Sequence, residues 1–354
     1  MTLTRIPCTY MRGGTSRGLV FHARDLPPDR AAWDAIFLAA MGVPDSAGRN
    51  LDGMGGGLSS LNKVCVIGPP SRDDADVDYT FAQCSVREAR VEYGGNCGNM
   101  SAAVGPFAVE EGLVPAPHDG EAVVRIHNSN TGKIIVARFP VEGGALAASG
   151  DMVIDGVEGS AAPIRLEFLA PGGAKTGKLL PTGSGSDLWD GVELSCIDAA
   201  NPCVFVSAAA LGKTGSETPQ ALEADAAFLA AMEAIRQAGA ERMGITGSAS
   251  VPLVAMVAGG GDNADITVRM ISMGQPHRAT PITGAICLAI AARIPGSIPQ
   301  RLCSAGEGPI RIAHPSGVTV VDAALNDAGE AVYGAVYRTA RRLFEGNILI
   351  PRRF

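Results

Sequence analysis

Two apolar, almost uncharged runs constrain the fold of this chain more than any other feature. The first covers residues 100–109 and follows Gly-Gly-Asn-Cys97-Gly; the second covers residues 282–292 and follows a turn that ends at Pro281. A helix that is apolar on every side has no face for solvent, so each run predicts a helix buried inside the fold. Strand-like segments and a turn precede each run, about half a chain apart, and this weak symmetry indicates a duplicated unit.

The length and the linker-like composition of one stretch predict two domains. A chain of 354 residues exceeds what one hydrophobic core usually supports. The Gly- and Pro-rich stretch 171–186 is typical of a linker, so we expect domains at 1–183 and 184–354. The last residues of the chain are free to return to the first domain. Alternating segments, including one at 86–93 ahead of Cys97, predict strands in addition to the two buried helices, as in an α+β fold.

Charge and cysteine usage exclude several classes of protein. The formal net charge of −7 argues against nucleic acid as a partner, because neutralising phosphates requires a basic face. We find no run of 18 apolar residues and no signal peptide, and we expect no membrane partner. The eight cysteines are scattered without a Cys-x-x-Cys pair. These features predict a reduced, cytoplasmic protein that holds no metal.

Cys97 and Lys63 are the strongest candidates for chemistry. Cys97 stands at the start of the first apolar helix, where the free backbone N–H groups favour an anion; its alternative role is that of a small buried hydrophobic residue. Lys63 closes a Gly/Ser-rich loop before an apolar strand, although a lone lysine is usually a solvated surface residue. Residues 57–64 nearly match a phosphate-binding loop. That motif requires Gly at 62 and Ser or Thr at 64, so we reject it.

Polar residues near two turns are candidates for binding a carboxylate. Residues 14–18 match the Gly-x-Ser-x-Gly pattern of serine hydrolases, but residues 19–22 predict a strand where that motif requires a helix, so hydrolysis at Ser16 is disfavoured. Arg12, Thr15 and Ser16 remain candidate ligands for a carboxylate. His277 and Arg278 precede the second apolar helix, where an arginine can clamp a carboxylate; the alternative is an ordinary exposed turn.

The order of motifs resembles one family across essentially the whole chain. The stretches that carry the resemblance are Tyr10-Met-Arg-Gly-Gly-Thr-Ser16, the Lys63 loop, Asn96-Cys-Gly-Asn99, Leu180-Pro-Thr-Gly183, Ser272-Met-Gly-x-Pro-His-Arg-Ala279 and Arg338-Thr-Ala-Arg-Arg-Leu343. Together they resemble the PrpF family of bacterial tricarboxylate isomerases. The resemblance implies a diaminopimelate-epimerase-like fold, in which two similar domains each wrap a β-barrel-like sheet around a central helix. It also implies a site in the cleft between the domains and no cofactor or metal.

The resemblance implies roles for individual residues as well. Lys63 and Cys97 would be the acid/base groups. The expected substrate-binding residues are Arg12, Gly14, Thr15, Ser16, Ser60, Asn62, Gly98, Asn99, Met100, His277, Arg278, Thr283, Gly284 and Ala285, with backbone N–H groups of the two helix starts holding carboxylates. Asn62 stands where many relatives carry Ser. We match Thr283-Gly284-Ala285 to Cys97-Gly98-Asn99; the related epimerases have a second cysteine at this place, and a threonine hydroxyl is too weak an acid to replace it.

A lysine and a single cysteine fit double-bond migration better than stereo-inversion. We therefore expect 1,3-allylic proton transfer, or keto–enol tautomerisation, in a small anionic tricarboxylate. The stretches 74–79, 81–83 and 103–108 look closest to enzymes that act on 4-oxalomesaconate in aromatic catabolism. 2-Methylaconitate and methylitaconate remain alternative substrates, and a non-catalytic dicarboxylate-binding protein remains an alternative class. A homodimer is left open.

Overall fold

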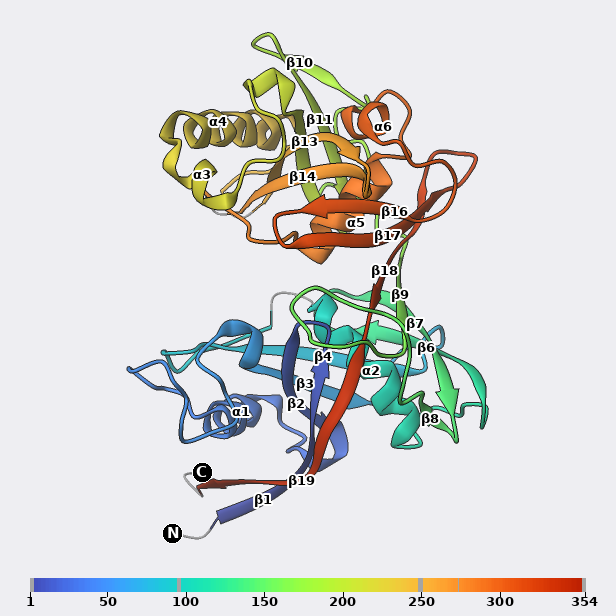
Figure 1. Ribbon diagram of the computed structural model, residues 1–354. Helices are drawn as coiled ribbons and strands as arrows, with labels where there is room; N and C mark the ends of the chain where they lie inside the picture. The colour runs from blue at the N-terminus through green and yellow to red at the C-terminus, as the bar shows by residue number, and fades with distance from the viewer. Residues whose placement is uncertain (1–2, 94–96, 248–250, 273, 352–354) are drawn as a thin grey trace. The chain divides into compact units, whose positions relative to one another are not determined.

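The chain folds into two compact units. The computed structural model describes residues 3–93, 97–247, 251–272 and 274–351 (Figure 1). Unit 1 comprises Met1–Leu166 together with Tyr337–Phe354, and unit 2 comprises Glu167–Val336. The chain passes from unit 1 to unit 2 within strand β9 (Ile164–Leu169) and returns within strand β18 (Ala331–Arg338). The last strand therefore belongs to unit 1.

The Gly- and Pro-rich stretch 171–186 is a folded loop of unit 2. It wraps around the buried Asp198, whose Oδ2 accepts hydrogen bonds from the backbone N–H groups of Lys175 and Thr176 at 2.9 and 2.7 Å and from Thr176 Oγ1 at 2.8 Å. A buried carboxylate is stable only when such donors satisfy it. Composition alone suggested a linker here, but unit 1 ends at Leu166 and not at residue 183.

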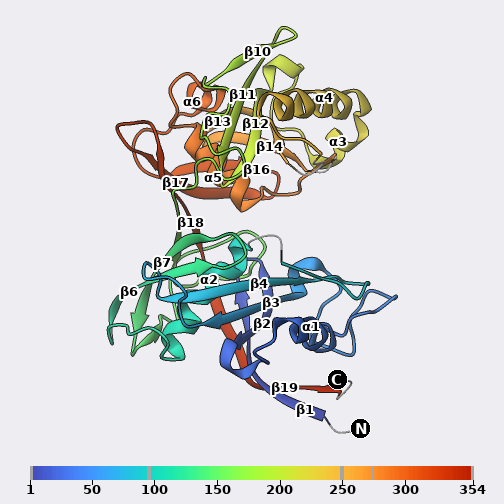
Figure 2. The same ribbon diagram turned by 180° about the vertical axis from the view of Figure 1, so that it is seen from behind.

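Unit 1 is built on a mixed sheet. Its strands lie in the order β19-β1-β2-β3-β4-β6-β7, and β1 pairs antiparallel with β19 from Leu3 to Gly13 (Figures 1 and 2). From β1 to β7 the neighbouring pairs are in turn antiparallel, parallel, antiparallel, parallel and antiparallel. The strands are β1 (Leu3–Gly13), β2 (Ser16–His22), β3 (Lys63–Gly68), β4 (Val77–Cys84), β6 (Gly120–Asn128), β7 (Lys133–Glu142) and β19 (Ala340–Pro351), with the two-residue strands β5 (Val91–Glu92) and β8 (Ala145–Leu146) at the margins.

Unit 2 repeats this succession of strands. From β11 to β17 the neighbouring pairs are again antiparallel, parallel, antiparallel, parallel and antiparallel, in the order β11-β12-β13-β14-β16-β17. The duplication expected from the two apolar runs is therefore confirmed at the level of topology. The strands are β10 (Asp187–Trp189), β11 (Val192–Ala199), β12 (Asn201–Ser207), β13 (Leu253–Gly261), β14 (Ala264–Ser272), β15 (Gln275–Pro276), β16 (Ile310–His314) and β17 (Gly317–Leu325), followed by β18.

Each sheet carries helices on its two faces. In unit 1, α1 (Trp33–Met41) packs over a cluster that includes Val64 and Val66 of β3, while α2 (Gly98–Glu110) contacts strands β1, β2, β3, β6 and β7. In unit 2, α4 (Ala226–Arg242) covers residues of β11, β12 and β13, and α5 (Ile282–Ala291) contacts β11, β12 and β17. The short helices α3 (Pro219–Ala224) and α6 (Ile298–Leu302) complete unit 2.

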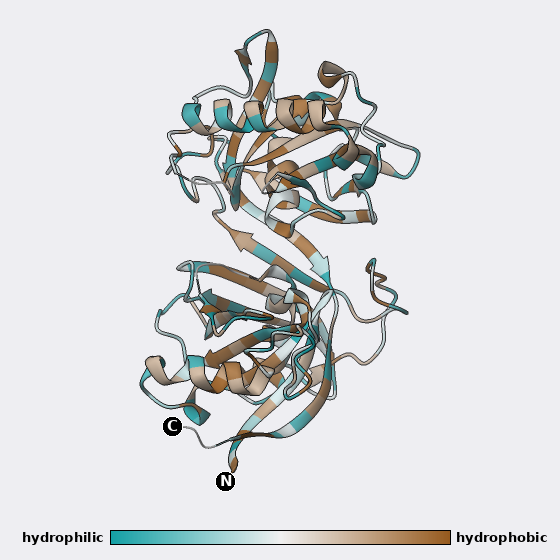
Figure 3. Cartoon of the chain, turned by 90° about the vertical axis from the view of Figure 1, so that its left-hand side faces the viewer, coloured by the Kyte–Doolittle hydropathy of each residue, from teal (hydrophilic) through white to brown (hydrophobic). Residues whose placement is uncertain are grey.

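The two apolar helices are buried as expected. Every residue of α2 from Met100 to Val109 is buried, and so is every residue of α5 from Gly284 to Ala291. The strands that face them are largely hydrophobic (Figure 3). Among the described residues, no helix is both long and apolar enough to cross a membrane.

The strand predicted at 86–93 is much shorter in the structure. Only Val91–Glu92 forms a strand, β5, which pairs with the end of β4. The preceding residues form a turn closed by the hydrogen bond from Ser85 N–H to Arg90 O at 2.9 Å. Alternation of apolar and polar residues thus marks a strand only where a partner strand is available to supply hydrogen bonds.

Arg342 ties β19 to the C-terminal end of α2. Its Nε donates to Glu110 Oε2 at 2.8 Å and its Nη1 donates to Glu111 Oε1 at 2.8 Å, while Glu111 Oε2 also bonds His22 Nε2 at 3.0 Å. Carboxylates at a helix C-terminus are disfavoured by the helix dipole, so this cation offsets an otherwise unfavourable placement. Burial alone would raise the pKa of Glu111, but the hydrogen bonds from His22 and Arg342 outweigh it and hold that pKa below its usual value.

Removing this cation should destabilise unit 1. We expect Arg342→Ala to lower the free energy of unfolding by about 2–3 kcal/mol, the usual worth of hydrogen bonds to charged groups. Because the pKa of Glu111 is lower in the folded state, its stabilising contribution is present above its ordinary value of 4.5 and is lost as the pH falls through the folded value. The difference in Tm from wild type should therefore shrink as the pH falls below 4.5.

The neighbouring residue provides the control for this measurement. Arg341 is exposed and its charge acts on Arg12, so Arg341→Ala removes a repulsion and no carboxylate partner. Calorimetric scans should show Arg341→Ala within about 0.5 kcal/mol of wild type, the usual range for surface substitutions. Equal losses in the two variants at neutral pH would contradict a specific role for Arg342.

Candidate active site

Strand alternation places Lys63 on the face of the unit 1 sheet that α2 covers. Lys63 is the first residue of β3, and since Val64 and Val66 pack beneath α1, Lys63 and Cys65 lie on the opposite face. The Lys63 side chain is largely buried, with the residue 9% exposed. Its Nζ donates to Gln83 Oε1 at 2.8 Å and lies 5.1 Å from the centre of the Phe81 ring. Lys63 is thus a fixed interior amine.

Gln83 orients this amine. It lies directly across from Lys63 in the antiparallel β3–β4 pair. Its Nε2 donates to the backbone oxygens of Ser59 and Asn62 at 2.9 and 3.0 Å, which leaves Oε1 to accept from Lys63. Sequence inspection missed Gln83, because the residue opposite Lys63 follows from the register of two strands that the sequence does not display.

Two of the predicted substrate ligands precede Lys63 in the same loop. The Asn62 side chain is fully buried: its Oδ1 accepts from Gly56 N–H at 3.0 Å and its Nδ2 donates to Asn50 Oδ1 at 3.1 Å. Through these bonds Asn62 holds the loop ahead of β3 in place. Its side chain therefore has a structural role in this loop. Ser60 is half-buried in the short turn Ser59–Leu61.

Cys97 is the N-cap residue of α2. Its backbone is extended (φ −106°, ψ 97°), its side chain makes no capping hydrogen bond, and the residue is 9% exposed. The first helical bond runs from Ser101 N–H to Cys97 O at 2.9 Å, so the N–H groups of Gly98, Asn99 and Met100 have no acceptor within the helix. This end of the helix dipole favours an anion. Residues 94–96 and 273, which belong to the motifs used above, lie outside the described residues.

The turn between β1 and β2 packs against this helix start. Asn99 Nδ2 donates to Thr15 Oγ1 at 3.1 Å. Gly14 has a φ of +51°, and a side chain there would collide with Asn99 Oδ1, so both its conformation and its contact require glycine. Ser16 is buried at the start of β2. The structure therefore brings the predicted residues Gly14, Thr15 and Asn99 together.

Arg12 holds the same turn in place through hydrogen bonds. Its Nη1 donates to Gly14 O at 3.0 Å and to the Thr339 backbone and side-chain oxygens at 3.1 and 2.9 Å, and Gly14 N–H donates to Thr339 O at 2.8 Å. This nitrogen is already committed to joining the turn to the segment that leads into β19. Binding of a substrate carboxylate by Arg12 remains a prediction.

Lys63 and Cys97 both lie close enough to Cys65 to shift its pKa. The pKa of Cys65 is raised to about 12: burial and the nearby Cys97 raise it, while the Tyr79 hydrogen bond and the charge of Lys63 partly oppose the shift. Cys65 Sγ lies 3.8 Å from Tyr79 Oη. At neutral pH Cys65 is therefore a neutral thiol. It lies within electrostatic reach of both candidate acid/base groups.

Unit 2 lacks the equivalents of both groups. The parallel β2–β3 pair sets Gly18 opposite Lys63, and the corresponding β12–β13 pair sets Cys203 opposite Leu253, so Leu253 occupies the place of Lys63. The N-cap of α5 is Pro281, which by cap position is the counterpart of Cys97. Unit 2 carries no ionisable side chain at either place.

The substrate contacts predicted at the start of α5 need two corrections. Thr283 is the second residue of α5, so its match to Cys97 was displaced by two positions, because the helix begins at Ile282. The N–H of Ala285 makes the first helical bond, to Pro281 O at 2.8 Å, and is not free for a ligand; Gly284 keeps a free helix-start N–H. Arg278 pairs with both oxygens of Glu223 at 2.8 and 2.9 Å on the surface, and its binding of a substrate carboxylate remains a prediction.

His277 has a structural partner as well. Its backbone N–H donates to Met270 O at 2.8 Å, and its Nδ1 accepts from Ala279 N–H at 3.0 Å. These bonds shape the turn that leads into α5. No contact in unit 2 assigns His277 a substrate role, and that role remains a prediction.

Comparison with known proteins places this architecture in a family. The fold is that of the proline racemase and diaminopimelate epimerase group: a hydroxyproline epimerase from Agrobacterium vitis superposes with a TM-score of 0.54 at 12% identity, covering 98% of this chain and 92% of that one. A model described as "PrpF protein" matches residues 3–351. The chain belongs to the PrpF family.

Relatives in this family are similar over nearly their whole length. The chain is 43% identical to the 4-oxalomesaconate tautomerase of Pseudomonas putida (99% of this chain and 98% of that one) and 40% identical to the 3-methylitaconate isomerase of Eubacterium barkeri (98% of each). It is 38% identical to the 2-methyl-aconitate isomerase of Cupriavidus necator (98% and 97%). The crystal structure of a methylitaconate-delta-isomerase superposes with a TM-score of 0.93 at 39% identity, covering 99% and 96%.

Proposed function

We propose that this protein is a cofactor-independent isomerase that moves a double bond within an unsaturated tricarboxylate. The observation that carries the proposal is that a buried lysine of β3 and the cysteine at the N-cap of α2, the helix that covers this face of the sheet, both lie within electrostatic reach of Cys65. The N–H groups at this helix start have no acceptor within α2. Three relatives at 38–43% identity are named as isomerases of small unsaturated acids. The proposal uses only groups of the chain itself.

The proposed reaction is a 1,3-proton transfer. One group removes a proton from a carbon next to a carboxylate or keto group, and the electron pair of that C–H bond spreads into a dienolate. The other group returns a proton two carbons away, which forms a new C–H bond as the double bond shifts. We propose Lys63 and Cys97 for these two steps. The N–H groups of Gly98, Asn99 and Met100 would hold a carboxylate or the enolate oxygen, each worth roughly 2.7–4 kcal/mol.

The asymmetry between the units supports double-bond migration over stereo-inversion. Inverting a stereocentre requires an acid on one face of the carbon and a base on the other. Unit 2 offers Leu253 and Pro281 at the equivalent places, and neither can exchange a proton. Two proton-transfer groups within unit 1 suit a substrate whose two reacting carbons belong to one allylic system.

We propose 4-oxalomesaconate as the first substrate to test. The stretch 81–83 resembles enzymes that act on this acid, and its residues Phe81 and Gln83 contact Lys63. The alternatives are 2-methylaconitate and methylitaconate, because identities between 38% and 43% do not separate relatives with different substrates.

The test is turnover of each acid in deuterated water, followed by proton NMR. We expect isomerisation with deuterium entering at the new C–H position, and the highest kcat/KM for 4-oxalomesaconate. If one of the other two acids had a higher kcat/KM, the proposed substrate would change to that acid and the proposed reaction would stand. Tight binding of all three acids without isomerisation or hydrogen exchange would overturn the proposal in favour of a carboxylate-binding protein.

A further inference from the structure

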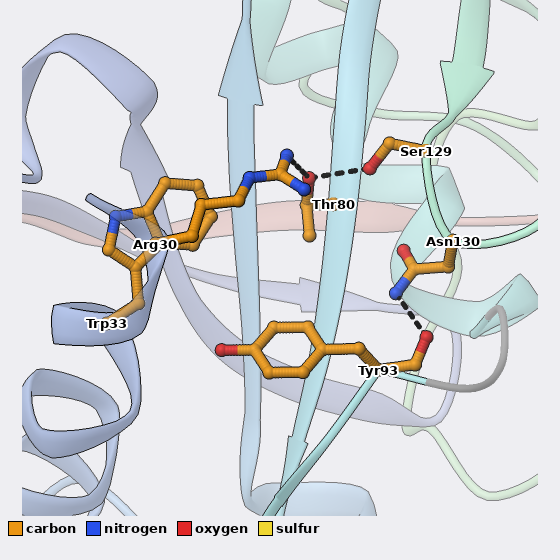
Figure 4. Close-up of a pocket in the computed structure, with 6 residues that line it drawn as sticks. All are labelled: Arg30, Trp33, Thr80, Tyr93, Ser129 and Asn130. Carbon is orange, nitrogen blue, oxygen red and sulfur yellow. Dashed lines mark hydrogen bonds between the residues drawn. The ribbon is translucent and has the colours of Figure 1, made fainter. Parts of the chain in front are cut away.

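A cavity lies in unit 1 on the face of the sheet away from Lys63. It measures about 330 Å³ and is lined by Arg30, Trp33, Thr80, Tyr93, Ser129 and Asn130 (Figure 4). Thr80 lies opposite Val66, whose side chain packs beneath α1, so this cavity opens on the face away from Lys63. Its volume is within the range of sites for small molecules.

Arg30, an exposed residue, gives the lining of the cavity a positive charge. Within the described part of the chain, Arg30 forms no ion pair; its Nη2 donates to Thr80 Oγ1 at 3.0 Å, and its guanidinium carbon lies 5.0 Å from the centre of a Trp33 ring. Thr80 Oγ1 is in turn 2.7 Å from Ser129 Oγ. A guanidinium has five N–H donors in a planar fork, so several remain available for a carboxylate.

The walls of the cavity are fixed aromatic rings. Trp33 is buried and its Nε1 donates to Pro27 O at 2.8 Å. Tyr93 Oη donates to Asp34 Oδ1 at 2.6 Å, which fixes the orientation of its ring. Figure 4 shows Arg30 extending across Trp33 toward Thr80, with the Tyr93 ring bordering the same space.

Asn130 holds this arrangement in place. Its Nδ2 donates to Tyr93 O at 2.6 Å and to Phe81 O at 2.8 Å, and its Oδ1 accepts from Phe81 N–H at 2.8 Å. Both N–H donors of this amide are therefore used to hold Tyr93 and Phe81 in place. A preformed site loses less conformational entropy when a ligand binds.

From this geometry we infer that the cavity binds a small planar organic carboxylate. The carboxylate accepts from the Arg30 guanidinium, and the planar body lies against the Trp33 and Tyr93 rings. Among the lining residues that the structure describes, Arg30 is the single cation, which suits a monoanion with an apolar body better than a phosphate. This site is separate from Lys63 and Cys97 and does not depend on the proposed isomerase activity.

Trp33 itself can report the ligand. The chain has two tryptophans, so in a Trp189→Phe background the fluorescence comes from Trp33 alone. We expect benzoate to change this fluorescence saturably, and neutral benzamide and inorganic phosphate to leave it unchanged. Arg30→Gln should weaken benzoate binding by about tenfold or more, the effect of losing a charge-assisted hydrogen bond.

Two further variants make the result decisive. Arg24→Gln, which removes an exposed arginine outside the lining, should bind benzoate as the parent does. Lys63→Met should also bind it unchanged. The inference is overturned if benzoate gives no saturable change, if benzamide or phosphate binds as well as benzoate, if Arg30→Gln keeps the parent affinity, or if Lys63→Met abolishes the signal.

Discussion

Replacing Lys63 by methionine should lower kcat for the tricarboxylate substrate by about 10²–10⁴-fold. This is the usual contribution of a positioned acid/base group and corresponds to about 3–5 kcal/mol of activation free energy. Methionine fills a similar volume with an apolar chain, and the site is already largely buried against Phe81. The fold should therefore survive, and kcat measured by proton NMR reports the lost amine.

A matched surface lysine separates this effect from a general loss of charge. Lys133 begins β7 in the same unit and is exposed, so Lys133→Met should keep kcat and KM within about twofold of wild type. If Lys63→Met kept more than half of the wild-type kcat, Lys63 would not transfer a proton. If Lys63→Met instead lost its activity because the protein no longer folded, as shown by a large fall in Tm, Lys63 would have a structural role.

The large-scale features of the fold follow from local sequence patterns. A run such as 100–109 that offers no polar face has to be buried, and the structure buries it. The repetition of this run at 282–292 predicted the duplication that the strand pairings confirm. Lys63 and Cys97 were recognised because each stands at the junction of a polar loop and a buried element.

The contacts of the site depended on pairings that the sequence does not encode locally. Gln83 orients Lys63 only because the β3–β4 register sets them opposite each other. Asn62 supports its loop because Asn50 and Gly56 are folded back onto it. The stretch 171–186 has the composition of a linker, yet the buried carboxylate of Asp198 gathers it into unit 2. Each difference arises from a partner distant in sequence.

The two units differ in the side chains that they place at equivalent positions. They share the succession of strand pairs, but only unit 1 has ionisable groups at the first residue of its third strand and at the N-cap of its central helix. In unit 2, Gly284 packs on Met270 and Leu253, so the equivalent space is apolar. One copy of the duplicated unit thus carries both groups that we propose for proton transfer.

Cys97→Ser should remove activity without weakening the fold. We expect kcat to fall by about 10²–10⁴-fold, because a hydroxyl is a far weaker acid than a thiol. Serine is a preferred N-cap residue, whereas Cys97 makes no side-chain capping bond, so the Tm of the variant should equal or exceed that of wild type. Loss of activity at undiminished stability would identify the thiol as the chemical requirement.

Exchange in deuterated water then assigns the step. If Lys63 removes the proton and Cys97 returns one, Cys97→Ser should still exchange the abstracted hydrogen for deuterium while isomerisation stops, and Lys63→Met should do neither. If Lys63→Met exchanged the hydrogen without isomerisation and Cys97→Ser did neither, Cys97 would remove the proton and Lys63 would return it. Cys303 is the one half-buried cysteine among eight, all of them described and free, so Cys303→Ser serves as the control and should match wild type. Wild-type isomerisation by Cys97→Ser would show that another group returns the proton, because serine could not replace the thiol at that rate.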